Sequence, residues 1–206
     1  MKTLTLLTAV VATLTTAQTP APYTDPKSGI TFSTFQHTSG MFFGLTLPLN
    51  STSNTSFIAT IGGKGTSYSG VSLGGGMLNK LLLIAWPNGQ SIVSSFRKTA
   101  TYASPTVATG TFSQRAIANG TYVNSTHWTY TFLCERCIQS DGTTFRATDG
   151  KPSIGFVLNP SAPAKKGDQA ASVSRHTEQG QVVFDLGRAK REGFEVWRGW
   201  AEIGNA

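Results

Sequence analysis

The chain has 206 residues and a formal net charge of +7 at pH 7, and only 13% of its residues are charged. This length supports one hydrophobic core but is short for two domains, and the two cysteines exclude a scaffold built on many disulfides. The basic balance suits an acidic polysaccharide, an acidic protein or an anionic metal chelate as partner, but a solvated basic face that keeps the protein soluble is the favoured interpretation.

The N-terminus has the pattern of a secretory leader. Residues 1–17, MKTLTLLTAVVATLTTA, carry a positive charge at Lys2, an apolar and threonine-rich run, and small residues before a cleavage point after Ala17. The run is too short to span a membrane, and no later segment is apolar for long enough. We therefore predict a signal peptide over 1–17 and one secreted, extracellular domain over 18–206, a monomer without membrane or nucleic-acid partners.

Short apolar or alternating runs, broken by glycine, proline and serine, fill the rest of the chain. Most have the length of a strand, and several alternate apolar and polar residues with period two. The runs are residues 30–35, 42–47, 57–61, 81–86, 91–96, 127–134, 154–158 and 182–186. This pattern predicts an all-β fold, an antiparallel sandwich of the immunoglobulin-like kind.

Two local signals refine this pattern. Residues 86–90, WPNGQ, separate two runs, and Asn88 and Gly89 suit positive φ angles, so a hairpin should make the flanking strands antiparallel neighbours. Near the C-terminus, Phe194, Trp197 and Ala201 are spaced like one face of a helix, which predicts a short helix there.

Four glycosylation sequons lie in polar, turn-like segments, where a glycan would stay in solvent. They begin at Asn50, Asn54, Asn119 and Asn124. Sequons arise easily by chance in a chain rich in serine and threonine, but four of them agree with the predicted secretion.

Chemistry-bearing residues are few. No serine sits in a nucleophile-elbow pattern and the acidic residues form no evident pair, so hydrolysis is poorly supported. The segment 70–77, GVSLGGGM, sets Met77 after three glycines, and methionine is both a flexible core filler and a soft metal ligand. His37, His127 and His176 are each more simply structural than ligating, although His176 precedes an apolar run much as Met77 does.

Cys134 and Cys137 form a CxxC motif at the end of a predicted strand. A zinc site needs two more ligands and no other cysteine exists, while covalent haem attachment needs a histidine where Ile138 stands. A thioredoxin-like role needs a helix N-terminus and a βαβ context, which the pattern lacks. A small structural disulfide is the interpretation that remains.

Several motifs together resemble the haem b cytochrome domain of fungal cellobiose dehydrogenase. They are YTDP at 23–26, GVSLGGGM at 70–77 followed by LLLIAW at 81–86, the Asn-Gly turn and IVSS at 92–95, NSTHW at 124–128, the CxxC motif, and SRHT at 174–177 before Phe184 and Asp185. The likeness extends over nearly the whole chain after the leader and keeps the order of the motifs.

The resemblance implies a set of cofactor residues. Met77 and His176 match the two axial ligands of a noncovalent haem b, held six-coordinate in a pocket at one end of the sandwich. Tyr102 matches a tyrosine that meets a haem propionate, and we place Arg97, shortly before it, among the cofactor-binding residues. Gly74, Gly75 and Gly76 would let a flat macrocycle approach the backbone. The family also forms a disulfide in its CxxC motif.

The resemblance further implies outer-sphere transfer of single electrons, because two axial ligands leave the iron no open position. The best-known relatives continue into a flavin dehydrogenase, for which this sequence has no dinucleotide motif. We therefore expect a stand-alone cytochrome that takes electrons from a separate extracellular dehydrogenase or a small reductant. The expected acceptors are a copper polysaccharide monooxygenase or ferric complexes, and reduction of the latter would be a ferric reductase activity. The rival hypothesis is a non-redox module that binds polysaccharide through aromatics such as Tyr68 or Trp128.

Overall fold

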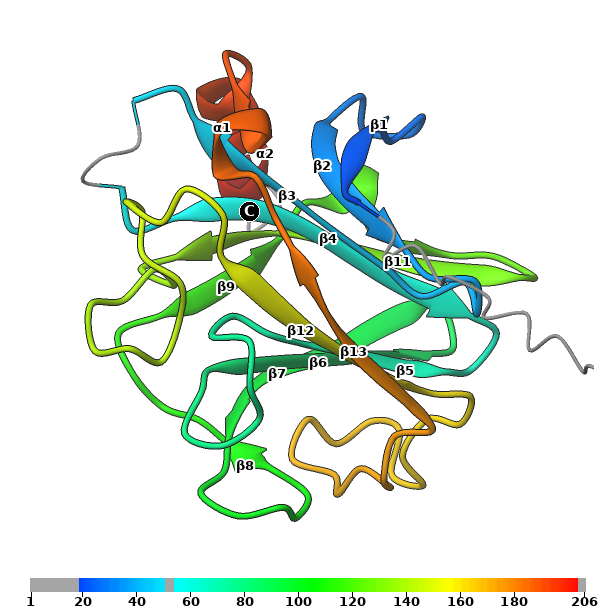
Figure 1. Cartoon of the computed structure of the whole chain (residues 1–206). Coiled ribbons are helices and arrows are strands. Elements are labelled where there is room, and N and C mark those ends of the chain that lie inside the picture. The colour runs from blue at the N-terminus through cyan, green and yellow to red at the C-terminus, as the bar shows by residue number, and fades with distance from the viewer. Residues whose placement is uncertain (1–18, 51–53, 204–206) are drawn as a thin grey trace, which may run out of the picture.

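Two antiparallel sheets form a sandwich in the computed structural model, which describes residues 19–50 and 54–203 (Figure 1). The predicted signal peptide over 1–17 lies outside the described residues. The first sheet orders its strands as β1 (Ala21–Thr24), β2 (Thr31–Gln36), β3 (Phe42–Pro48), β4 (Phe57–Lys64), β11 (His127–Glu135) and β10 (Tyr122–Val123), with β9 (Ser113–Ala116) on β11 and β14 (Lys190–Arg191) on β3. Among the described pairings only β14 with β3 is parallel. The all-β sandwich prediction is confirmed.

The second sheet has six strands. Their order is β13 (Glu178–Val183), β12 (Ser153–Asn159), β5 (Tyr68–Ser72), β6 (Leu82–Asn88), β7 (Ser91–Lys98) and β8 (Thr106–Val107). Alternate residues of these strands point into the space between the sheets and alternate residues point away from it. Val71, Leu83 and Phe156 therefore join Phe43 and Leu45 of the first sheet in the main core.

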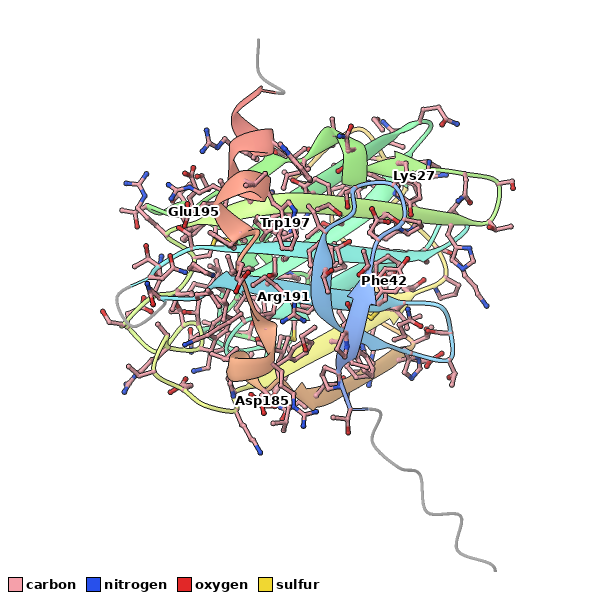
Figure 2. The ribbon with its side chains drawn as sticks, turned by 90° about the horizontal axis from the view of Figure 1, so that it is seen from above. Lys27, Phe42, Asp185, Arg191, Glu195 and Trp197 are labelled. Carbon is pink, nitrogen blue, oxygen red and sulfur yellow. A yellow bond between two sulfur atoms is a disulfide. The ribbon has the colours of Figure 1, made fainter. Side chains whose placement is uncertain are left out.

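Helices cover the outer face of the first sheet. The helix α2 (Phe194–Ile203) follows the short helix α1 (Leu186–Ala189), and η1 (Ala118–Gly120) is a single 3-10 turn. Phe194 and Ala201 of α2 are buried in a second apolar cluster with Ile30 and Phe32, and Trp197 packs against it. Figure 2 looks down on this face and shows α2 lying over the strands. In the part of the chain that is described, no helix is long and apolar enough to cross a membrane.

The local predictions are largely confirmed. Asn88 pairs with Ser91 across the β6–β7 hairpin. Gly89 has a φ of +63°, whereas Asn88 is not among the described residues with positive φ. A turn with glycine at its first central position needs only that one residue to be left-handed. The predicted helix is α2, and Cys134 and Cys137 form a disulfide.

The last predicted strand was placed too late. We expected it over 182–186, but β13 covers Glu178–Val183, and Leu186 begins α1. The Asp185 side chain accepts a hydrogen bond from the Arg188 backbone N–H and so caps the first turn of that helix.

Candidate functional site

A pocket of about 810 Å³ lies over the outward face of the second sheet. Its floor is made by the residues of β5, β6, β12 and β13 that point away from the main core. In one row across the sheet these are Gln179, Val157, Gly70 and Ile84, and in the next row Gln181, Gly155, Ser72 and Leu82. Apart from Ser72, whose hydroxyl donates to the Gly76 carbonyl oxygen, the centre of the floor is apolar or has no side chain, and polar side chains stand at the β13 edge.

Two glycines keep the floor flat. An added Cβ on Gly155 would overlap the carbonyl oxygen of Gly75, and one on Gly70 would lie 2.9 Å from Val157 Cγ2. Glycine within a strand usually marks a place where another backbone or a ligand comes close. At Gly155 the group that comes close is the backbone of the Met77 loop itself, whereas at Gly70 a planar apolar ligand could lie on the face of the sheet.

Three loops wall the pocket. The β5–β6 loop, residues 73–81, carries Met77 at one end of the sheet, and the loop over 99–105 after β7 carries Tyr102. The β12–β13 loop, residues 160–177, leaves the other end of the sheet and folds back over its outward face with His176. The chain thus brings side chains from both ends of the sheet to one cavity.

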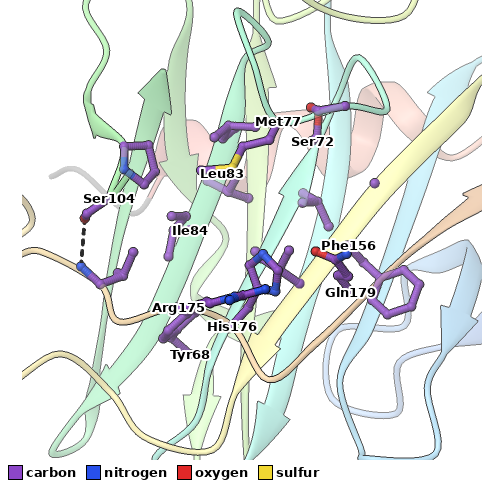
Figure 3. Close-up of a pocket in the computed structure, with 18 of the residues that line it drawn as sticks. Tyr68, Ser72, Met77, Leu83, Ile84, Ser104, Phe156, Arg175, His176 and Gln179 are labelled. Carbon is purple, nitrogen blue, oxygen red and sulfur yellow. Dashed lines mark hydrogen bonds between the residues drawn. The ribbon is translucent and has the colours of Figure 1, made fainter. Parts of the chain in front are cut away.

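Met77 and His176 both line this pocket and are both partly buried. Figure 3 shows Met77 in the upper part and His176 in the lower part of the group of lining residues. Burial lowers the pKa of His176, and the positive charge of Arg175 lowers it further. The neutral imidazole, which is the form that ligates metals, is favoured by both effects.

The end of the His176 loop is fastened to the sheet by side-chain donors. The Tyr68 hydroxyl donates to the carbonyl oxygen of Ser174 at 2.6 Å, and Asn159 Nδ2 donates to that of Arg175 at 2.8 Å. The Thr177 backbone N–H donates to the Leu158 carbonyl oxygen at 2.9 Å. The two residues before His176 and the one after it are therefore each held in place.

The Met77 loop is fastened mainly through its backbone. The Leu73 N–H donates to the Leu81 carbonyl oxygen at 3.0 Å and closes the base of the loop. Gln181 Nε2 donates to the Gly75 carbonyl oxygen at 3.2 Å, and the Ser72 hydroxyl donates to that of Gly76. The strand β13, which follows His176, thus also supports the loop that carries Met77.

The three glycines before Met77 differ in what they face. An added Cβ on Gly74 would lie 2.7 Å from the Thr143 carbonyl oxygen, so the packing of the protein itself excludes a side chain there, and Gly74 is not among the pocket-lining residues. Gly75 has a φ of +82°, a conformation that favours glycine. Gly76 lines the pocket, and nothing lies within 4 Å of its added Cβ.

Tyr102 and Arg97 are placed very differently. Tyr102 lies at the pocket rim with 83% of its surface exposed. Arg97 is buried and is not among the pocket-lining residues. Its guanidinium donates to backbone carbonyl oxygens of two of the wall loops instead. Arg97 can therefore affect the site only through the two loops that wall the pocket.

The charge of the lining is positive. Besides His176, which can titrate, the charged residue among the described lining residues is Arg175, and these residues include no Asp or Glu. Arg175 was not singled out from the sequence. Its position directly before His176 was the signal that could have found it. Floor residues such as Gly155 carried no local signal in the sequence, because only strand pairing brings Gly155 beneath Gly75 of the Met77 loop.

The aromatics of the rival polysaccharide hypothesis are not available for binding. Tyr68 is 2% exposed and Trp128 is fully buried, and the Trp128 indole N–H donates to the Ser67 carbonyl oxygen. Polysaccharide binding by stacking needs an exposed ring face, which neither residue presents. The assignment of these two residues to sugar binding is therefore wrong.

The predicted glycosylation sites lie at or near the surface. Asn50, Asn119 and Asn124 are exposed and Asn54 is partly buried, while residues 51–53 after Asn50 lie outside the described part. Asn124 Oδ1 accepts hydrogen bonds from the N–H and the hydroxyl of Thr126, so its sequon forms a tight turn.

Comparison with known proteins agrees with this geometry. Residues 23–196 match the family described as the cytochrome domain of cellobiose dehydrogenase. A pyrroloquinoline quinone-dependent pyranose dehydrogenase of Coprinopsis cinerea is 27% identical over 187 residues, which are 88% of this chain and 26% of that protein. This chain thus spans about a quarter of the length of that curated relative.

Solved structures show the same likeness. The cytochrome domain of Myriococcum thermophilum cellobiose dehydrogenase matches with a TM-score of 0.80 and 27% identity, covering 90% of this chain and 98% of that one. The cytochrome b domain of Coprinopsis cinerea pyranose dehydrogenase matches with a TM-score of 0.78 and 24% identity, covering 89% and 96%, which supports the fold alone. The predicted resemblance is confirmed, and the chain belongs to the family of cellobiose dehydrogenase cytochrome domains.

Proposed function

We propose that this chain holds one noncovalent haem b between Met77 and His176 and serves as an electron-transfer protein. The observation that supports this most is the meeting of a thioether and an imidazole, far apart in the sequence, in one pocket with an apolar floor. Either residue alone would be an ordinary structural residue. Their joint presence in a chain of this family suggests that both side chains would hold the haem iron.

The residues present fit haem b. Leu82, Ile84 and Val157 offer an apolar floor, the glycines keep it flat, and Arg175 supplies a cation for a ligand that carries carboxylates. When bound, haem b supplies a one-electron iron couple, and a methionine opposite a histidine raises its potential. With Met77 and His176 both ligating, no open coordination position would remain for oxygen or substrate.

The other residues would orient the group and exclude water. The floor keeps the interior dry, which helps to set a potential. Arg175 would pair with a haem carboxylate, and the exposed Tyr102 hydroxyl at the rim would donate a hydrogen bond to one. Gly75 and Gly76 would let the ligand lie close to the backbone of the Met77 loop.

The family suggests redox partners outside the cell. Its relatives include dehydrogenases that act on sugars by their names, so an extracellular dehydrogenase is the proposed donor. A copper polysaccharide monooxygenase or a ferric complex is the proposed acceptor, and the basic net charge favours anionic chelates among the latter. The leader-like residues 1–17 and the disulfide support secretion of the protein.

An absorption spectrum of the purified protein tests the proposal. We expect a sharp Soret band, and resolved α and β bands after reduction with dithionite. Met77→Ala and His176→Ala should each lose the six-coordinate low-spin spectrum, while the far-ultraviolet circular dichroism of the sandwich is unchanged. His127→Ala, a histidine on β11 outside the pocket lining, is the matched control and should keep the spectrum.

Two results would contradict the proposal. A colourless protein that also fails to take up added haem would refute the proposal that the chain binds haem b. If the unmodified protein shows the low-spin spectrum, its full retention in Met77→Ala or His176→Ala would refute the assignment of that residue as a ligand.

A further inference from the structure

Arg97 is an arginine buried at the edge of the pocket floor. It is 1% exposed, and it pairs with Leu82 across the β6–β7 ladder in the same outward-facing row as the floor. A buried guanidinium is costly unless its donors are satisfied. The charge of Asp168 acts on Arg97, but no Asp or Glu of the described residues forms an ion pair with it, so carbonyl oxygens and one hydroxyl accept its hydrogen bonds.

The acceptors of Arg97 come from two different walls of the pocket. Arg97 Nη1 donates to the carbonyl oxygens of Pro105 at 3.0 Å and Ala171 at 2.9 Å, and Nη2 donates to that of Gln169 at 2.6 Å. Pro105 ends the loop that carries Tyr102, whereas Gln169 and Ala171 belong to the loop that carries His176. We call this set of contacts the Arg97 bridge.

Two neighbours reinforce the bridge. Ser95, also on β7, accepts from Arg97 Nε at 2.9 Å and donates to the Gln169 carbonyl oxygen at 3.0 Å. Farther along the two loops, the Val173 backbone N–H donates to Ser104 Oγ at 3.0 Å, and Figure 3 shows this link across the rim. The two walls are thus tied at their base by Arg97 and again near their edge by Ser104.

We propose that Arg97 is a positioning residue that fixes the His176 and Tyr102 walls against each other and so presents His176 to the cofactor at a set position. The fork of the guanidinium is suited to this because one planar group can donate to several acceptors in fixed directions. A lysine keeps the charge but offers a single compact donor group. Where this inference concerns haem, it rests on the proposed function.

The first test uses the haem-free full chain. Hydrogen–deuterium exchange is compared between the unmodified protein, Arg97→Met, Arg97→Lys and Ser104→Ala. We expect exchange over 99–107 and 160–177 to become at least about tenfold faster in Arg97→Met, less so in Arg97→Lys and Ser104→Ala, with no change in β4 and β11. Lys98→Met, which removes the charge of the exposed residue at the end of β7, should leave both segments unchanged.

The second test uses the haem-loaded proteins. Transfer of haem to an excess of an apo-globin should be about 10- to 100-fold faster in Arg97→Met than in the unmodified protein, the range typical for groups that orient a ligand. The low-spin bands should weaken in the same variant, and Arg97→Lys should restore them in part. Lys98→Met should match the unmodified protein in both readouts.

The outcomes separate the two proposals. Exchange that rises equally in β4 and β11 would reduce Arg97 to general support of the fold, and unchanged exchange in both loops would remove the bridge. If Arg97→Met does not fold, the absence of selective loosening in both Arg97→Lys and Ser104→Ala overturns the inference. If the unmodified protein takes up no haem, the proposed function fails, while the exchange comparison still decides whether the bridge exists.

Discussion

Gly76 is the one glycine of its triplet that the surrounding protein does not require. Gly74 is excluded from carrying a side chain by the Thr143 carbonyl oxygen, and Gly75 by its positive φ. Gly76 has open space at its Cβ position and a φ outside the left-handed range. Because it lines the pocket, the room it leaves is room for a ligand.

Substitutions at these positions should separate stability from binding. Gly76→Ala should change the free energy of unfolding of the haem-free chain by no more than about 1 kcal/mol, whereas Gly74→Ala should lower it by about 1–3 kcal/mol through overpacking. Gly76→Leu should fold but bind haem more weakly. Urea unfolding and haem titration measure the two effects, and an equal loss of stability at both positions would refute this interpretation.

At the scale of elements, β12 is the strand that contacts both the Met77 loop and the His176 loop. Gly155 in its centre lies under Gly75 of the Met77 loop, and Asn159 at its end donates to the loop of His176. The same strand therefore supports both the loop that carries Met77 and the loop that carries His176. A change in β12 should be felt on both sides of the pocket.

Gly155→Ala is expected to displace the Met77 loop, because the added Cβ meets a backbone oxygen that cannot rotate away. Gly70→Ala, a second floor glycine on the neighbouring strand, gives a comparison, since its added Cβ lies 2.9 Å from Val157 Cγ2 and no closer than 3.2 Å to a backbone oxygen, that of Leu83. We expect Gly155→Ala to weaken the low-spin bands of the haem-loaded protein more than Gly70→Ala does. Absorption spectra of the two variants measure this, and the opposite order would contradict the packing argument.

The elements differ in how far the sequence predicts them. The β6–β7 hairpin and α2 were predictable, because an Asn-Gly turn and a helix-spaced apolar face are local signals. β5, with the sequence YSGVS, was missed because its small residues leave room for the pocket and weaken the strand pattern. β13, with EQGQVV, was placed too late because its residues face the polar edge of the site.

The site was predictable only in part. The residue types alone allow Met77 and His176 to be ligands but do not require it. Only the resemblance to a family predicted that the two residues act together. The floor and the Arg97 bridge depend on the register of five strands and on loops that fold back over them. Such long-range contacts leave no local pattern in the residues that make them.

At the scale of the whole molecule, stability should fall in alkali. Burial between the sheets raises the pKa of Tyr130 to about 12, against about 10 in an unfolded chain. Below pH 10 this side chain is protonated in both states, and between pH 10 and 12 it ionises first in the unfolded chain. Its contribution to stability is therefore complete below pH 10 and is lost as the pH rises through 12.

Tyr130→Phe should flatten this alkaline loss. The ratio of unfolding midpoints in urea at pH 9 and pH 11.5 measures it, with Tyr102→Phe, changed at an exposed side chain, as the matched control. Tyr130→Phe should lose less stability between the two pH values than either the unmodified chain or the control. An identical loss in all three would show that Tyr130 does not ionise on unfolding in this range.

The second sheet contributes one face to the core and the other to the pocket. Along β5, β6 and β12, residues that build the core alternate with residues that make the pocket floor. Val71 thus packs in the core, whereas its neighbour Gly70 forms part of the floor. A slip of one residue in the pairing would send every core side chain outward and every floor residue inward. Inserting or deleting one residue in these strands would therefore disrupt the core together with the pocket. Only substitutions can change the pocket without changing the core.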